Sequence, residues 1–266
     1  MVPVDGQWRV VIVHVPGAAA GAALPLVLSL HGSGGTAAAQ EAFTAMDAAA
    51  DVAGFIVAYP QGALSIAGGF AWNVPGQPLV DGSSVPAGAQ DDAVFIAQAI
   101  AFIEARYSVD ARRIYATGMS GGARMASQLG CDLATLVAAV APVAGLRFPS
   151  PCAGQRPVPV VAFHGTADTT NPYDGGGPAY WTYSVPSAAA QWAVHDACGA
   201  TPVVSQTAAS VQLTSYPDCS ASSAVDLYTI DGAGHEWPGA PGQNGAIDAT
   251  AVMWQFFQAH PLPSVE

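Results

Sequence analysis

One serine in this chain stands among glycines, in the segment YATGMSGGARM that covers residues 115–125. The β-rich apolar run before Ser120 predicts a strand, and the residues from Ala123 onward predict a helix. A G-x-S-x-G turn between a strand and a helix presents the serine hydroxyl on a sharp bend, which requires small neighbours such as Gly118 and Gly122. The pattern therefore predicts a nucleophile at Ser120.

Such a serine needs a base to accept its proton, and histidine is the usual one. Hydrolases with this turn place serine, acid and histidine in that chain order, which excludes His14 and His31. His235 lies in DGAGHEWPG, on a turn of small residues directly after a predicted strand, and we expect it to be the base. Three other histidines follow the serine in a buried strand end, a polar helix and the chain end: His164, His195 and His260.

The acid that orients the imidazole is expected after a strand between the serine and the histidine. Asp168 ends the predicted strand VPVVAFHGTAD at 158–168 and is our candidate, with Asp174 as its competitor. Four further aspartates are less well placed: Asp196, Asp218, Asp226 and Asp231. Beside Gly or Thr an aspartate commonly bonds its own backbone, so a purely structural turn role stays open for each of them.

Acyl transfer also requires donors for the negative charge that develops on the carbonyl oxygen. The backbone N–H after the nucleophile belongs to Gly121, and a second donor is expected in a loop after an early strand. LHGSGG at 30–35 fits that place, with the Ser33 N–H as the candidate. A glycine turn with no ligand remains the alternative for this stretch.

These residues need a sheet whose strand ends meet at one edge. Apolar runs predict strands at 8–16, 24–35, 54–62, 136–145, 158–168 and 224–239. Helices are predicted at 37–52, 91–109 and 247–261, and Asp91 and Asp92 are expected to be carboxylates at a helix start. The alternation predicts an α/β fold with a mostly parallel, doubly wound sheet and helices on both faces. We find no repeat or linker and expect one domain over residues 1–266.

Two long segments, 62–90 and 169–223, are predicted to be loops rich in glycine, proline or aromatic residues. Trp72 and Trp181 lie in these segments, and Trp237 follows the proposed base by two residues. We expect all three to contact substrate. Packing beneath the long loops is the alternative for each of them.

Composition limits the possible partners. The 266 residues carry a formal net charge of −12, with 7 basic residues that are all arginine and 19 acidic ones. An acidic surface without a basic patch argues against nucleic-acid and membrane-surface binding. No run of residues is long and apolar enough to predict a membrane span. We expect a monomer that acts on an ester substrate and needs no metal or organic cofactor.

The four cysteines are Cys131, Cys152, Cys198 and Cys219. None forms a C-x-x-C pair, which argues against zinc, and their even number favours two disulfides in an oxidising compartment. Of the three possible pairings we favour Cys131–Cys152 and Cys198–Cys219, because each closes a loop of modest length; four free, buried thiols are the alternative. We expect an exported protein whose signal peptide has been removed, since MVPVDGQWRV lacks the features of one.

Five stretches occur in the order of a known family: LHGSGG, DDAVFI, YATGMSGGARM, FHGTAD and GAGHEWPG. Over about residues 8–260 the chain resembles the secreted feruloyl esterases and polyhydroxybutyrate depolymerase-like esterases of carbohydrate esterase family 1, within the α/β-hydrolases. The resemblance implies paired disulfides. It also implies a Ser-His-Asp triad and an oxyanion hole made of these residues: Ser120, Asp168, His235, Ser33 and Gly121.

Three functions follow for comparison. The first is a secreted serine carboxylic-ester hydrolase that acts through an acyl-enzyme on feruloyl or related plant-wall esters. The second is an extracellular polyester depolymerase of the polyhydroxybutyrate type, with the same triad. The third is a catalytically silent fold that binds carbohydrate, which the presence of every catalytic group disfavours.

Overall fold

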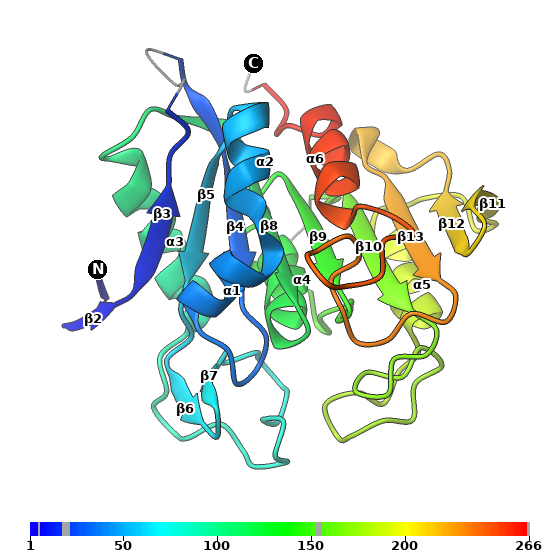
Figure 1. Cartoon of the computed structure of the whole chain (residues 1–266), viewed down its shortest axis with the longest axis horizontal. Coiled ribbons are helices and arrows are strands. Elements are labelled where there is room, and N and C mark those ends of the chain that lie inside the picture. Colours follow the sequence, from blue (N-terminus) through cyan, green and yellow to red (C-terminus); the bar gives the residue numbers. More distant parts are fainter. Residues whose placement is uncertain (5, 18–21, 153–155, 265–266) are drawn as a thin grey trace.

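A sheet of nine strands organises the computed structural model, which describes residues 1–4, 6–17, 22–152 and 156–264 (Figure 1). Neighbouring strands from β13 to β5 run parallel, and antiparallel pairs occur only toward the two edges. This arrangement confirms the predicted mostly parallel sheet. Across the sheet the strands are β11 (Val203–Ala208), β12 (Val211–Tyr216), β13 (Val225–Ile230), β10 (Val160–Gly165), β9 (Ala139–Val143), β8 (Val109–Met119), β4 (Leu24–Leu30), β5 (Ile56–Pro60) and β3 (Val11–His14).

Helices cover both faces of the sheet, as predicted (Figure 1). One face packs against α3 (Asp92–Glu104), α4 (Gly121–Asp132) and α5 (Val185–His195), and the other against α1 (Ala37–Thr44), α2 (Met46–Ala53) and α6 (Ala249–Ala259). Strand β4 shows how the sequence serves both layers, because Leu26 and Leu28 enter the first core and Val27 enters the second. Among the described helices, none has the length and apolarity to cross a bilayer.

Several predicted elements are shorter or divided. The helix expected at 37–52 breaks at Ala45, whose φ of 49° ends α1 and starts α2. The strand expected at 8–16 is also interrupted: β2 (Gln7–Arg9) pairs with β1 (Val2–Val4), outside the main sheet. Within 62–90 a small hairpin forms from β6 (Leu64–Ile66) and β7 (Gly69–Ala71). The expected loop at 169–223 contains α5 and the pair β11–β12.

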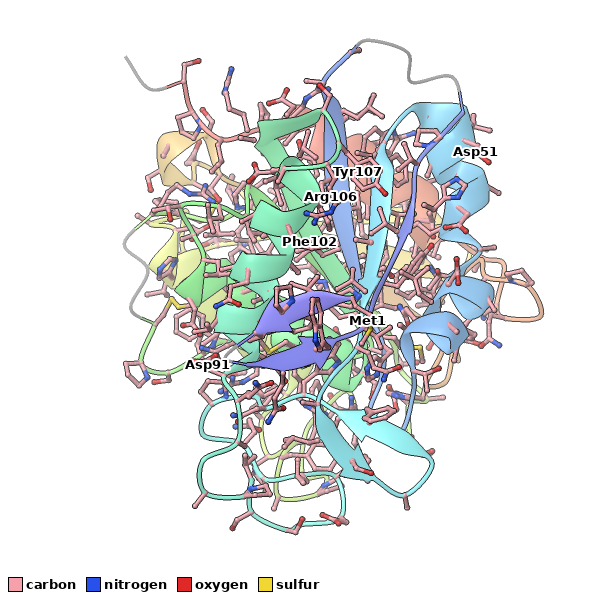
Figure 2. The ribbon with its side chains drawn as sticks, turned by 90° about the vertical axis from the view of Figure 1, so that its left-hand side faces the viewer. Met1, Asp51, Asp91, Phe102, Arg106 and Tyr107 are labelled. Carbon is pink, nitrogen blue, oxygen red and sulfur yellow. A yellow bond between two sulfur atoms is a disulfide. The ribbon has the colours of Figure 1, made fainter. Side chains whose placement is uncertain are left out.

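The two carboxylates at the start of α3 have different roles. Asp91 is the N-cap and accepts the N–H groups of Ala93 and Val94, as expected of a helix-start carboxylate. Asp92 is fully buried, bonds Arg9 at 2.7 Å and accepts the Asn73 N–H at 2.8 Å. Burial raises the pKa of Asp92, and the neighbouring Arg9 opposes that rise. Asp92 thus ties the β1–β2 hairpin, which lies beside Asp91 in Figure 2, to α3.

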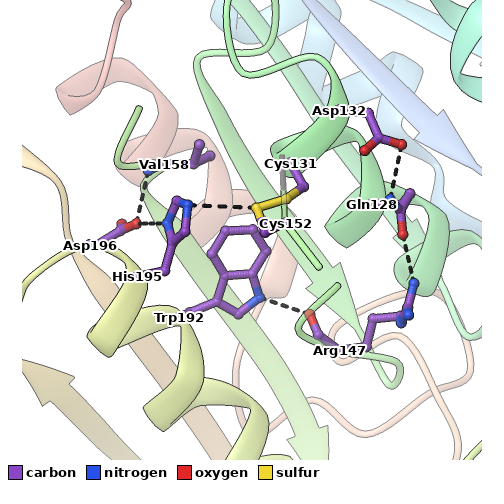
Figure 3. The surroundings of a disulfide bond; sticks show 9 residues. All are labelled: Gln128, Cys131, Asp132, Arg147, Cys152, Val158, Trp192, His195 and Asp196. Atoms are coloured by element: carbon purple, nitrogen blue, oxygen red, sulfur yellow. Dashed lines mark hydrogen bonds and ion pairs between the residues drawn. A yellow bond between two sulfur atoms is a disulfide. The ribbon is translucent and has the colours of Figure 1, made fainter. Parts of the chain in front are cut away.

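Both disulfides join the pairs favoured from the sequence, Cys131–Cys152 and Cys198–Cys219. The first links the end of α4 to the segment that leads toward β10 (Figure 3). Beside it, the Trp192 indole donates to the Arg147 carbonyl at 2.7 Å, so α5 is fastened to the same region. Disulfides persist in oxidising compartments, which is consistent with an exported protein.

Candidate active site

Ser120 occupies the bend between β8 and α4. Its φ of 56° and ψ of −114° are rare for a residue with a side chain, and backbone strain of this kind costs roughly 1–3 kcal/mol. The Ser120 N–H donates to the Val143 carbonyl at 2.9 Å, which anchors the bend to the neighbouring strand β9. The side chain is partly exposed. Strained backbone held by its surroundings is typical of functional positions.

The glycines around the serine are required by close backbone contacts. A Cβ at Gly118 would lie 2.6 Å from the Leu30 carbonyl oxygen, and a Cβ at Gly122 would collide with the same oxygen. A Cβ at Gly145 would collide with the Ser120 carbonyl oxygen. The expectation that Gly118 and Gly122 must be small is therefore confirmed, and it follows from the tight passage of α4 over the end of β4.

The proposed acid and base lie beside each other. Asp168 follows β10 and His235 follows β13, two adjacent parallel strands, and Asp168 Oδ2 is 2.7 Å from His235 Nδ1. The Asp168 side chain has no exposed surface, while the His235 side chain is 21% exposed. An ionised carboxylate only accepts hydrogen bonds, so Nδ1 carries the proton. Nε2 of His235 is then left free to act as a base.

Asp168 is also a turn aspartate. Its Oδ1 accepts the N–H groups of Thr170 and Asn171, each at 2.8 Å, and His164 Nε2 lies 3.3 Å from Oδ2. Burial opposes ionisation, but hydrogen bonds from His164, His235 and Asn171 outweigh it and hold the pKa of Asp168 well below its ordinary value. The turn role and the orienting role, treated above as alternatives, are therefore compatible at this residue.

Thr170, Asn171 and His164 support the site and were not assigned to it from the sequence. The usable signal was the run Asp168-Thr-Thr-Asn171, because an aspartate followed by small polar residues favours a turn closed by its own side chain. His164 was expected to be structural, and it is buried with Nε2 bonded to the Asn171 carbonyl at 2.8 Å.

The serine and the histidine approach from strand ends at one edge of the sheet, with β9 and β10 between β8 and β13. Within the described ranges, the Ser120 hydroxyl has no hydrogen-bond partner, and the Asp168–His235 pair therefore stands without a bond to the serine. Such bonds are often long in enzymes without substrate and tighten when substrate binds. In the proposed reaction the bond between the Ser120 hydroxyl and His235 Nε2 therefore forms when substrate is bound.

Ser33 and Gly121 also lie together. A Cβ placed on Gly121 would be 3.0 Å from Ser33 N, so the two backbone segments are in direct contact. Neither the Ser33 N–H nor the Gly121 N–H finds an acceptor among the described residues. The Gly121 N–H is the first of α4, and the first N–H groups of a helix have no partner within it. These two N–H groups beside Ser120 can donate hydrogen bonds to an oxyanion and stabilise its negative charge.

Replacing Ser33 with proline is expected to lower kcat for ester hydrolysis by about 100- to 1,000-fold, since it removes one of these donors. Ser33→Ala keeps the N–H and removes only the hydroxyl, so its loss should be far smaller. Steady-state kinetics on p-nitrophenyl acetate and thermal unfolding of both variants are the measurements. A proline variant that keeps the wild-type kcat contradicts the role of Ser33.

The expectation that three tryptophans contact substrate is corrected for two of them. Trp181 and Trp237 have no exposed surface. The Trp181 indole donates to the Pro172 carbonyl at 2.8 Å, and the Trp237 indole donates to the Thr250 hydroxyl at 3.0 Å. These side chains pack beneath the loops, because burying a large ring with a satisfied N–H is favourable.

Trp72 differs from the other two. It is 3% exposed and borders a narrow pocket that also touches Ser33 and Gly121, so contact with substrate remains a proposal for this residue. Its indole donates to the His31 carbonyl at 2.7 Å, and His31 Nε2 accepts the Gly62 N–H at 3.0 Å. Burial lowers the pKa of His31. Through these two hydrogen bonds His31 connects the start of the loop at Gly62 to Trp72.

Comparison with known proteins gives consistent results. The family model described as esterase PHB depolymerase matches residues 10–172. Feruloyl esterase B of Piromyces equi is 32% identical over 96% of this chain, and poly(3-hydroxyalkanoate) depolymerase C of Paucimonas lemoignei is 30% identical over 90%. The chain spans 46% and 61% of the lengths of these two relatives. The solved acetyl xylan esterase from Aspergillus awamori shares the fold, with a TM-score of 0.63, 19% identity and coverage of 94% of this chain and 93% of its own.

Proposed function

This chain belongs to the esterase PHB depolymerase family, and on that premise we propose that it is a serine carboxylic-ester hydrolase that acts through an acyl-enzyme. The observation that carries the proposal is the 2.7 Å contact between Asp168 and His235, at the same sheet edge as a serine held on a strained strand–helix bend. Each of these three residues follows a different strand: Ser120 follows β8, Asp168 follows β10 and His235 follows β13.

In the proposed mechanism, His235 Nε2 accepts the proton of Ser120 Oγ as that oxygen attacks the ester carbonyl. The N–H groups of Ser33 and Gly121 bind the oxyanion of the tetrahedral intermediate. His235 then gives the proton to the leaving alcohol, and water repeats the sequence on the acyl-enzyme. Asp168 holds the imidazole in place and stabilises its positive charge, for which its low pKa suits it.

For the substrate we propose feruloyl or related plant-wall esters, because feruloyl esterase B is among the relatives that align with nearly the whole chain. A polyester depolymerase is the second candidate, and the poly(3-hydroxyalkanoate) depolymerase relative favours it. We further propose one catalytic domain over residues 1–266 that acts as a monomer outside the cytoplasm, where its two disulfides persist.

A fluorophosphonate probe followed by peptide mass mapping tests the reaction class. We expect the label on Ser120, together with hydrolysis of p-nitrophenyl acetate. Rates on methyl ferulate against release of soluble oligomers from polyhydroxybutyrate film then separate the two substrate classes. Absence of both label and hydrolysis, with measurable glycan binding, would instead support a carbohydrate-binding fold.

A further inference from the structure

Arg124 is buried one helical turn after the serine. Its N–H donates to the Ser120 carbonyl at 3.0 Å, and the residue is 4% exposed. Arg124 also borders the narrow pocket that Ser33 and Gly121 line. A charged side chain is almost never this buried without a partner, because removing it from water is costly. The position of Arg124 beside the proposed oxyanion donors therefore calls for an explanation.

No carboxylate compensates this cation in the described part of the chain. Nε and Nη1 of Arg124 are buried and have no hydrogen-bond partner, and the guanidinium lies 4.4 Å from the centre of the Tyr180 ring. The nearby Arg147 bonds Gln128 at 2.7 Å, and Gln128 bonds Asp132 at 2.9 Å. Asp132, the carboxylate of this region, is thus linked through Gln128 to Arg147 and not to Arg124. Burial lowers the pKa of Arg124, Tyr183 and Tyr180 oppose the fall, and Arg147 adds to it, yet an arginine keeps its charge in proteins.

The pocket is placed to receive the acyl part of an ester. It is lined by both proposed oxyanion donors, while neither His235 nor Asp168 lines it. The leaving alcohol must stand beside His235, which supplies its proton, so the acyl chain points the other way. Trp72 and Leu79 are apolar parts of the pocket wall. The free volume of the pocket is about 10 Å³, close to that of one water molecule, so a short acyl chain enters only when the wall shifts.

A second polar atom in the same pocket lacks a partner. Gln77 also lines the pocket, and its side-chain oxygen is buried with no hydrogen bond to any residue that the structure describes. Its NH₂ group donates to the Gly76 carbonyl at 3.3 Å. An amide can present either its oxygen or its NH₂ group, so Gln77 can exchange that bond for one to an anion. Arg124 and Gln77 border the same pocket, and donors from these two side chains match a carboxylate, which accepts bonds on both oxygens.

We propose that Arg124 is a specificity-determining residue that binds the free carboxylate of a short dicarboxylic acyl group. Half-esters of small dicarboxylic acids, with the succinyl group as the example, are then the favoured substrates. The inference rests on the proposed esterase function of the same site. It assigns the buried cation a counter-ion that arrives with the substrate, which gives a charge-assisted bond in a site with little water.

Two p-nitrophenyl esters of matched shape test this directly: the hemisuccinate and the 4-methylpentanoate, which differ in a terminal carboxylate against an isopropyl group. The wild-type protein is expected to show a kcat/KM at least about tenfold higher for the hemisuccinate, as a charged hydrogen bond allows. In Arg124→Met that ratio should fall by about 10- to 100-fold. Arg124→Lys, which keeps the charge, should recover part of it. A wild-type preference for the neutral ester, or a ratio unchanged in a folded Arg124→Met, overturns the inference.

Binding without turnover separates this inference from the proposed function. Calorimetry on Ser120→Ala is expected to show tighter binding of monomethyl succinate than of methyl 4-methylpentanoate, and the added Arg124→Met change should remove the difference. If this holds while the wild-type protein hydrolyses neither p-nitrophenyl ester, the esterase proposal fails and the carboxylate site stands. If Arg124→Met does not fold, the wild-type ratio and Arg124→Lys still decide the outcome.

Discussion

Ser120→Ala is expected to lower kcat/KM for p-nitrophenyl acetate by about a million-fold, the loss seen when a triad nucleophile is removed from a serine hydrolase. Without the hydroxyl no acyl-enzyme forms, and only the oxyanion donors and substrate binding continue to favour the reaction. Folding should be little affected, because a φ of 56° strains alanine and serine alike. Stopped-assay kinetics and thermal unfolding measure the two effects.

Ser127 provides the matched control, since it is a second serine on α4, the helix that begins directly after Ser120. Its hydroxyl donates to the Ala123 carbonyl at 3.0 Å and accepts the Arg147 N–H at 3.3 Å. Ser127→Ala should therefore cost some stability while the ester is still hydrolysed. If Ser120→Ala keeps more than about a hundredth of the wild-type rate, Ser120 is not the nucleophile, because triad losses are far larger.

The strand–serine–helix bend could be predicted from the sequence because its small residues stand next to the serine. Gly118 and Gly122 lie within two residues of Ser120, although the contacts that exclude their side chains are made largely with the Leu30 carbonyl at the end of β4. The pair Asp168–His235 could also be predicted, since adjacent parallel strands such as β10 and β13 bring their carboxyl ends to the same edge of the sheet. Chain order then selects one histidine that follows such a strand.

Other features depend on contacts that no local pattern encodes. Residue 45 is an alanine, a strong helix former, yet tertiary packing places it at φ 49° and divides the predicted helix. Trp181 and Trp237 lie in or beside long loops, and the sequence does not say which face of a loop is covered. Arg124 fits an ordinary helix position, and only the assembled structure shows that no carboxylate of the described residues pairs with its guanidinium.

Asp168→Asn is expected to lower kcat/KM by about 10,000-fold. The amide removes the negative charge that stabilises the imidazolium, and its NH₂ group can donate to His235 Nδ1, which favours the wrong tautomer. Asp174→Asn is the control, because Asp174 was the competing candidate and is exposed in the loop after β10. Kinetics on p-nitrophenyl acetate distinguish the two: a loss in the Asp174 variant instead would reassign the acid.

The same substitution has a pH-dependent effect on stability. Hydrogen bonds hold the folded-state pKa of Asp168 below its ordinary value of 3.8, so the carboxylate stabilises the fold above pH 3.8 and this contribution is lost as the pH falls below it. Asp168→Asn should therefore be less stable than wild type at pH 7, and the difference should shrink toward pH 3. Denaturant unfolding at both values measures it. A difference that is constant with pH means that the Asp168 charge does not stabilise the fold, and the loss of activity then reflects the changed donor alone.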